Sequence, residues 1–113
     1  MNFKASAETY EYDIVLCFGK NIIYQIECKD YSTVSEDAKS DNTSLRNKVI
    51  FQPKDKASLI NAKCYVVLKG FSQKLLTEFE AFGKARDVTI LDESRYLDVI
   101  KKDIMTKLLE NII

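Results

Sequence analysis

Residues 10–29 read YEYDIVLCFGKNIIYQIECK, and this stretch decides how the fold begins. Aromatic and β-branched residues, which favour strands, dominate its two halves, 10–18 and 22–29. The halves are separated by Gly-Lys-Asn at 19–21, and a three-residue connection that contains Gly is typical of a hairpin. We therefore expect an antiparallel hairpin here, with a further strand before it near Asn2–Ala7.

The next segment, 31–48, is mostly polar, and its first dozen residues are expected to form an exposed loop. A helix is predicted to begin near Thr43 or Ser44 and to end before Pro53, because a residue that precedes proline avoids the helical region. A short second helix is expected within 54–62.

The second half of the chain alternates strands and helices. Residues 64–69, CYVVLK, form a continuous apolar run, which is typical of a central strand covered on both faces. Ser72 is a candidate N-cap for the helix that follows. Apolar residues at helical spacing then predict the buried face of that helix: Leu75, Leu76, Phe79 and Phe82.

Val88–Leu91 is a further short apolar run and predicts a last strand. Asp92 can cap a final helix, whose expected buried face is Leu97, Ile100, Ile104 and Leu108. A hairpin followed by alternating strands and helices indicates an α/β fold, with a mixed β-sheet flanked by helices.

Composition limits the class of protein. The chain has 113 residues, enough for a single domain over 1–113 but too few for two. It contains no apolar stretch long enough to span a membrane and its N-terminus lacks a signal-peptide pattern, so we expect a cytoplasmic protein without membrane contact. The absence of His and of CxxC pairs argues against classical zinc sites and His-based catalysis, and the three cysteines are expected to be buried.

The hairpin carries the residues with chemical potential. If its loop is centred on residue 20, Asp13 lies opposite Glu27, with the two Cβ atoms about 5 Å apart. Opposed like charges destabilise a sheet, and a divalent cation such as Mg²⁺, which prefers oxygen ligands, would compensate. Gln25 and Lys29 share a strand face with Glu27, because side chains alternate along a strand. Lys29 could then orient the attacking water and neutralise developing phosphate charge.

These residues also carry a family resemblance. Asp13, followed after a hairpin by Glu27-Cys28-Lys29, resembles the PD-(D/E)-x-K nuclease superfamily. The local sequence, Glu-Tyr-Asp-Ile-Val at 11–15 and Ile-Glu-Cys-Lys at 26–29, most resembles the nuclease domain of CRISPR-associated effectors activated by cyclic oligoadenylate. That domain typically has the sequence Asn-Glu-x-Asp, a hairpin and then Ile-Glu-Cys-Lys. The strong part of the match covers residues 11–29, whereas 64–110 agree only in layout.

The resemblance implies a restriction-endonuclease-like fold and a metal-dependent endonuclease that cleaves DNA or RNA, in a setting such as antiviral defence. It implies Asp13, Glu27 and the Cys28 carbonyl as ligands of Mg²⁺ or Mn²⁺, and Lys29 as the catalytic lysine. Glu11 matches an acidic position beside the metal.

The sequence departs from the family pattern in three respects. Tyr12 replaces the Pro of the motif, and Tyr10 stands near where the closest branch has Asn. Only twelve residues precede Asp13, so the helix that usually precedes the first catalytic strand is expected to be missing or abbreviated. An inactive nuclease-fold module that binds nucleic acid or protein is therefore the first alternative. A plain interaction protein with an accidental carboxylate pair is the second.

The charge balance and the C-terminus bear on partners. Lys plus Arg equals Asp plus Glu, at 17 each, which counts mildly against a nucleic-acid binder but suits a site that must hold acidic groups. Residues 104–113 are more apolar than one buried helix face requires. They favour either a homodimer contact, which would suit cutting of two strands, or core packing of a terminal helix.

Overall fold

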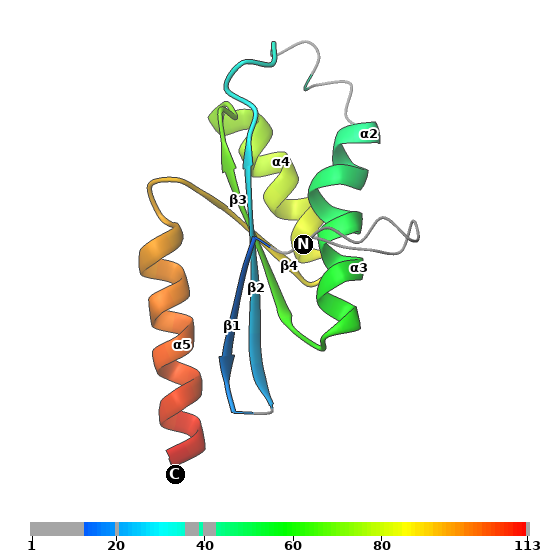
Figure 1. Ribbon diagram of the computed structural model, residues 1–113. Coiled ribbons are helices and arrows are strands. Elements are labelled where there is room, and N and C mark those ends of the chain that lie inside the picture. Colours follow the sequence, from blue (N-terminus) through cyan, green and yellow to red (C-terminus); the bar gives the residue numbers. More distant parts are fainter. Residues whose placement is uncertain (1–12, 20, 36–38, 40–42, 113) are drawn as a thin grey trace.

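The computed structural model describes residues 13–19, 21–35, 39 and 43–112, and its sheet has the strand order β1-β2-β3-β4 (Figure 1). The elements are β1 (Ile14–Phe18), β2 (Ile22–Asp30), α2 (Thr43–Arg46), the π-helical segment η1 (Asn47–Phe51), α3 (Gln52–Leu59), β3 (Lys63–Lys69), α4 (Gln73–Lys84), β4 (Val88–Asp92) and α5 (Tyr96–Ile112). The predicted α/β architecture, a mixed sheet flanked by helices, is confirmed.

Strands β1 and β2 form the predicted antiparallel hairpin, with pairs running from Ile14–Ile26 to Phe18–Ile22. Gly19 begins the turn with a positive φ of 76°, a conformation that glycine adopts without a steric penalty. The strand predicted near Asn2–Ala7, like the first residues of the predicted hairpin, lies outside the described residues. The remaining strands are parallel: β2 with β3, and β3 with β4.

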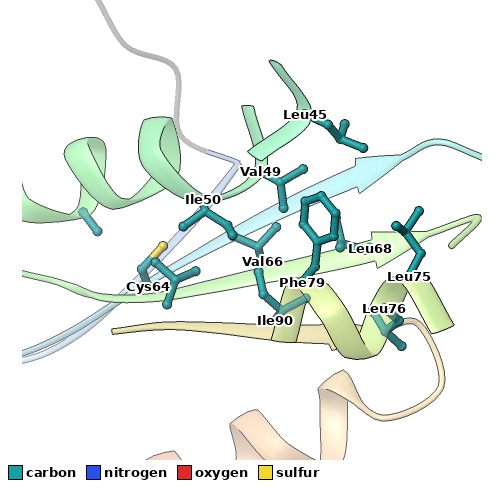
Figure 2. Close-up of a cluster of buried hydrophobic side chains, with 12 residues drawn as sticks. Leu45, Val49, Ile50, Cys64, Val66, Leu68, Leu75, Leu76, Phe79 and Ile90 are labelled. Carbon is teal, nitrogen blue, oxygen red and sulfur yellow. The ribbon is translucent and has the colours of Figure 1, made fainter. Parts of the chain in front are cut away.

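Helices cover both faces of the sheet. On one face lie α2, α3 and α4, and on the other lies α5 (Figure 1). The strand β3 lies between them, because Val66 and Leu68 belong to the core under α2–α4 (Figure 2) while Tyr65 and Val67 belong to the core under α5. The expectation of a central strand covered on both sides is confirmed.

The structure describes the helical segment after the loop from Thr43 onward, and this segment does not end before Pro53 as predicted. The helix runs through the proline because η1 changes the hydrogen-bond pattern: the Gln52 N–H donates to the Asn47 carbonyl, five residues back. Pro53 then follows directly after η1, so the π-helical turn accommodates the residue that lacks an N–H donor. The predicted second helix is therefore the end of one longer helical segment, which closes at Leu59.

Helix α4 forms as predicted. The Ser72 hydroxyl accepts a hydrogen bond from the Leu75 N–H at 3.2 Å, which is the N-cap geometry. Leu75, Leu76 and Phe79 are buried, and Phe82 is partly buried against the same core.

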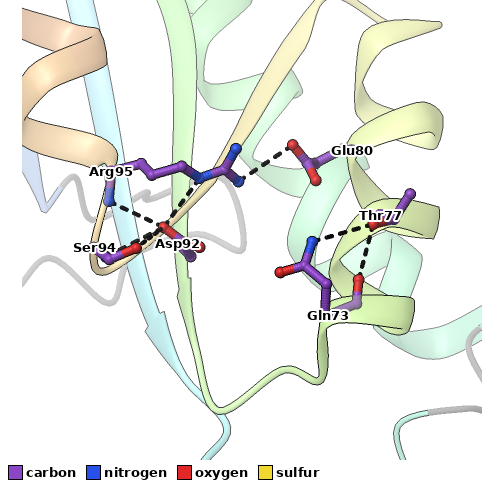
Figure 3. A network of polar contacts seen from close by, with 6 residues as sticks. All are labelled: Gln73, Thr77, Glu80, Asp92, Ser94 and Arg95. Atoms are coloured by element: carbon purple, nitrogen blue, oxygen red, sulfur yellow. Dashed lines mark hydrogen bonds and ion pairs between the residues drawn. The ribbon is translucent and has the colours of Figure 1, made fainter.

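The start of α5 is only partly as predicted. The Asp92 carboxylate accepts hydrogen bonds from the N–H groups of Ser94 and Arg95, in the turn that leads into the helix (Figure 3). The predicted buried face is wrong for Leu97, which is 62% exposed. Tyr96 and Val99 pack with Ile100 in its place, because the helix is rotated toward them over the sheet.

Two further expectations concern exposure. The prediction that all three cysteines are buried is wrong for Cys17 and Cys28, which are exposed, and correct for Cys64. Within the residues that the structure describes, no helix combines the length and apolar character needed to cross a membrane.

Candidate metal centre

The β1–β2 register places Asp13 across from Glu27. Ile14 pairs with Ile26, so the residue before Ile14 lies opposite the residue after Ile26. Opposed residues of an antiparallel pair project from the same face of a sheet, with their Cβ atoms about 5 Å apart. The register is therefore the one that the length of the turn predicts.

Glu27 is the buried member of this pair, with only 3% of its surface exposed. Its Oε1 atom accepts a hydrogen bond from Gln25 Nε2 at 3.2 Å and forms an ion pair with the Lys56 ammonium of α3. A carboxylate loses solvation on burial and needs compensation by a cation and by hydrogen-bond donors, and here it has both.

Asp13 is the exposed member, and it contacts the backbone of β2. Its Oδ2 atom accepts a hydrogen bond from the Cys28 N–H at 2.8 Å. In an antiparallel ladder the N–H and C=O of one residue face the same neighbour. The Cys28 carbonyl is therefore directed toward the side on which Asp13 lies, as a third metal ligand would need to be.

The charges of both carboxylates affect the pKa of the Cys28 thiol. Partial burial raises the pKa of the Cys28 thiol above its usual value, and the negative charges of Asp13 and Glu27 raise it further. The Cys28 side chain projects from the face of β2 opposite to Glu27, because side chains alternate along a strand, so the thiol is not among the candidate metal ligands. A cation at this position would bind oxygen atoms, which favours Mg²⁺ or Mn²⁺ over a thiolate-preferring metal.

Lys29 and Gln25 lie on the same face of β2 as Glu27, because side chains alternate along the strand. Lys29 is half-buried, and no described residue forms an ion pair or hydrogen bond with its ammonium. Gln25 is fully buried, and its Nε2 atom also donates to the Pro53 carbonyl at 3.3 Å. Nε2 thus donates to both Glu27 Oε1 and the Pro53 carbonyl, and these two acceptors fix the orientation of the Gln25 amide.

The donor set fits a hard divalent cation. Asp13, Glu27 and the Cys28 carbonyl offer oxygen atoms from adjacent strands, and Mg²⁺ commonly binds one or two carboxylates and completes its shell with water. Among the described residues no group of three or more His, Cys, Asp or Glu side chains could hold a metal, so the backbone carbonyl and water would have to complete the shell. The ion pair with the Lys56 ammonium shows that the Glu27 carboxylate already binds one cationic group.

Two residues complete the comparison with the sequence-based site. Glu11, the predicted supporting acid, lies outside the described residues. Lys56 lies within the second helix predicted for 54–62, but the side of that helix that faces the sheet was not predicted, so the contact with Glu27 was missed. A helix drawn through the proline would have put Lys56 three residues on, on the side of α3 that Pro53 buries.

No protein-family model, curated protein or solved structure matches this chain.

Proposed function

We propose that the chain is a metal-dependent nuclease that hydrolyses phosphodiester bonds of DNA or RNA. The observation that carries the proposal is the opposition of Asp13 and Glu27 across the hairpin, with Lys29 on the same strand face as Glu27. Two carboxylates and a lysine at the end of a hairpin can support phosphodiester hydrolysis with a divalent cation, because the carboxylates hold the cation and the ammonium balances phosphate charge.

Each residue has a separate task in this proposal. Bound Mg²⁺ or Mn²⁺ would supply Lewis-acid chemistry, lowering the pKa of water and stabilising charge on the phosphate. Asp13 and Glu27 would hold the cation, with the Cys28 carbonyl as a third oxygen. Lys29 would orient the attacking water and balance negative charge that develops on the phosphate oxygens.

An inactive nuclease-fold module is the second candidate, and one observation favours it. The burial of Glu27 is already compensated by this chain's own groups, the Lys56 ammonium and the Gln25 amide. A protein that had lost catalysis could keep such a pair for structural reasons and use its surface to bind nucleic acid or protein.

A cleavage panel separates the two candidates. Wild-type protein is incubated with Mg²⁺ or Mn²⁺ and with single- and double-stranded DNA and RNA, and Glu27→Gln, which keeps the shape of the side chain, is the matched variant. The nuclease proposal expects metal-dependent cleavage of at least one substrate by wild type and none by Glu27→Gln. Binding without cleavage in wild type would favour the inactive module.

A further inference from the structure

The contact between β2 and α3 is centred on Glu27. The side chains of Glu27 and of its partner Lys56 are 4% and 14% exposed, so the ion pair is largely removed from water. Burial of a lysine and a carboxylate removes water from both charges, and their mutual attraction must offset this desolvation cost. The burial of the Glu27–Lys56 pair is therefore not explained by the weak attraction typical of exposed surface charges.

Helix α3 makes a second contact with the same strand face. The Pro53 carbonyl accepts a hydrogen bond from Gln25 Nε2, and the same Nε2 atom lies 3.2 Å from Glu27 Oε1. Gln25 thus connects the first turn of α3 to the carboxylate, while Lys56 connects the next turn to it. Together the two contacts fix the position of Glu27 relative to the helix.

Gln25 also carries a buried acceptor. Its Oε1 atom has no hydrogen-bond partner among the described residues, although the side chain is fully buried. A buried carbonyl oxygen without a donor is costly, and it is satisfied when a donor enters the site. Water molecules that accompany a hydrated cation are such donors.

We infer that Lys56 is a positioning residue of the candidate metal centre, whose ammonium occupies the cation position on Glu27 until a divalent cation displaces it. This inference rests on the proposed function. An ammonium on one oxygen of a buried carboxylate repels a second cation, so the Lys56 contact with Glu27 Oε1 opposes metal binding there. Lys56 therefore sets the metal affinity of the site.

Metal titration of Lys56→Gln tests the inference. The variant loses the ammonium but keeps a hydrogen-bond donor for Glu27. A charge within 4–6 Å changes the proton affinity of a carboxylate by about tenfold or more, and we expect a similar gain in the affinity for Mn²⁺, measured by isothermal titration calorimetry at neutral pH. The melting temperature without metal should fall, while the increase that Mn²⁺ produces should be larger than in wild type.

Lys54→Gln is the matched control. Lys54 lies on the same helix and pairs with the exposed Asp87 at 3.8 Å, so the substitution removes the same charge and leaves the Lys56–Glu27 ion pair in place. Its Mn²⁺ affinity should equal that of wild type. Should Lys56→Gln fail to fold, Lys56→Arg takes its place: it keeps a cation on Glu27, and its Mn²⁺ affinity should not exceed that of wild type, so tighter binding would overturn the inference.

The outcomes distinguish this inference from the proposed function. Equal Mn²⁺ affinity in wild type and Lys56→Gln overturns the inference and makes the pair structural, whether or not the protein cleaves nucleic acid. Tighter binding in Lys56→Gln, without cleavage by any variant, supports the inference and contradicts the nuclease proposal. The absence of Mn²⁺ binding in both proteins contradicts both.

Discussion

Glu27 and Asp92 lie on parallel strands of one sheet, and each forms an ion pair with a basic side chain. The two pairs differ in burial and in the distance along the chain between their partners. Asp92 is paired with Arg95, three residues along the chain, and the arginine side chain is 47% exposed (Figure 3). Glu27 is buried and is paired with Lys56 from a separate helix. The Asp92 contacts organise a turn that the chain needs locally, whereas no turn or helix end requires the Glu27 pair.

This difference separates a charge pair with a local structural reason from a pair that the proposal assigns to a metal centre. Exposed pairs contribute little to stability, and the Asp92 network is explained by the backbone N–H groups that it satisfies. A buried pair gains little over apolar packing of the same volume, yet it is costly to break once formed. The Glu27–Lys56 pair lies opposite Asp13, where the proposal places the metal ion.

The largest expected effect comes from breaking the buried pair. Lys56→Met should lower the free energy of unfolding of the metal-free protein by about 3–5 kcal/mol, because Glu27 is left as an uncompensated buried charge. Arg95→Met, which breaks the exposed network, should cost about 1 kcal/mol or less. Urea denaturation measures both values, and equal losses would remove the distinction between the two regions.

The next effect is catalytic. Lys29→Ala should slow metal-dependent cleavage at least about a hundredfold, because a group that stabilises transition-state charge is lost while both carboxylates remain. Metal affinity should change much less than the rate. Lys101→Ala is the control, since it removes the same charge from an exposed position of α5, on the other side of the sheet. Cleavage by Lys29→Ala at the wild-type rate would show that the motif assignment is wrong.

A smaller effect concerns metal and thermal stability. Millimolar Mg²⁺ or Mn²⁺ should raise the melting temperature of wild type, because a ligand that binds only the folded state stabilises it. Asp13→Asn should abolish this increase and, because it relieves repulsion with Glu27, should leave the metal-free protein as stable as wild type or more so. Differential scanning fluorimetry checks both, and an unchanged wild-type curve with metal would favour a plain interaction protein.

The smallest effect is the pH dependence of the Asp92 region. Burial alone would raise the pKa of Asp92, but hydrogen bonds from Ser94 and Arg95 outweigh burial, and the pKa lies below its usual value. A lowered pKa in the folded state gives stability that is present above the unfolded pKa, about 4, and is lost as the pH falls through the folded pKa. Wild type should therefore be more stable than Asp92→Asn at pH 7, and the two should converge in acid.

Urea denaturation over a pH series measures this convergence. Glu93→Gln, at an exposed position of the same turn, should show no comparable convergence. A difference between wild type and Asp92→Asn that stays constant below pH 4 would contradict the assigned role of the carboxylate.

Much of the fold could be predicted because the signals are local. The hairpin, the central strand and the cap at Ser72 each follow from a few neighbouring residues. The helix through Pro53 could not be predicted, because the π-helical turn that accommodates the proline depends on how α2–α3 packs on the sheet. The rotation that exposes Leu97 is likewise set by tertiary packing rather than by helical spacing.

In the candidate site, too, local features could be predicted and contacts between separate elements could not. The opposition of Asp13 and Glu27 follows from the length of one turn, so the sequence alone was enough to predict it. Lys56 reaches Glu27 from another element, and no pattern within either segment records that contact. Burial of Glu27 with exposure of Asp13 depends on α3 covering β2, which is again a property of the assembled fold.

Paramagnetic broadening by Mn²⁺ tests the metal centre most directly. In a ¹H–¹⁵N spectrum of the wild-type protein, substoichiometric Mn²⁺ should first broaden the amide signals around Asp13, Glu27 and Cys28, and Asp13→Asn should abolish the effect. Broadening that begins elsewhere, or that is the same in Asp13→Asn, would show that these residues do not form a metal centre.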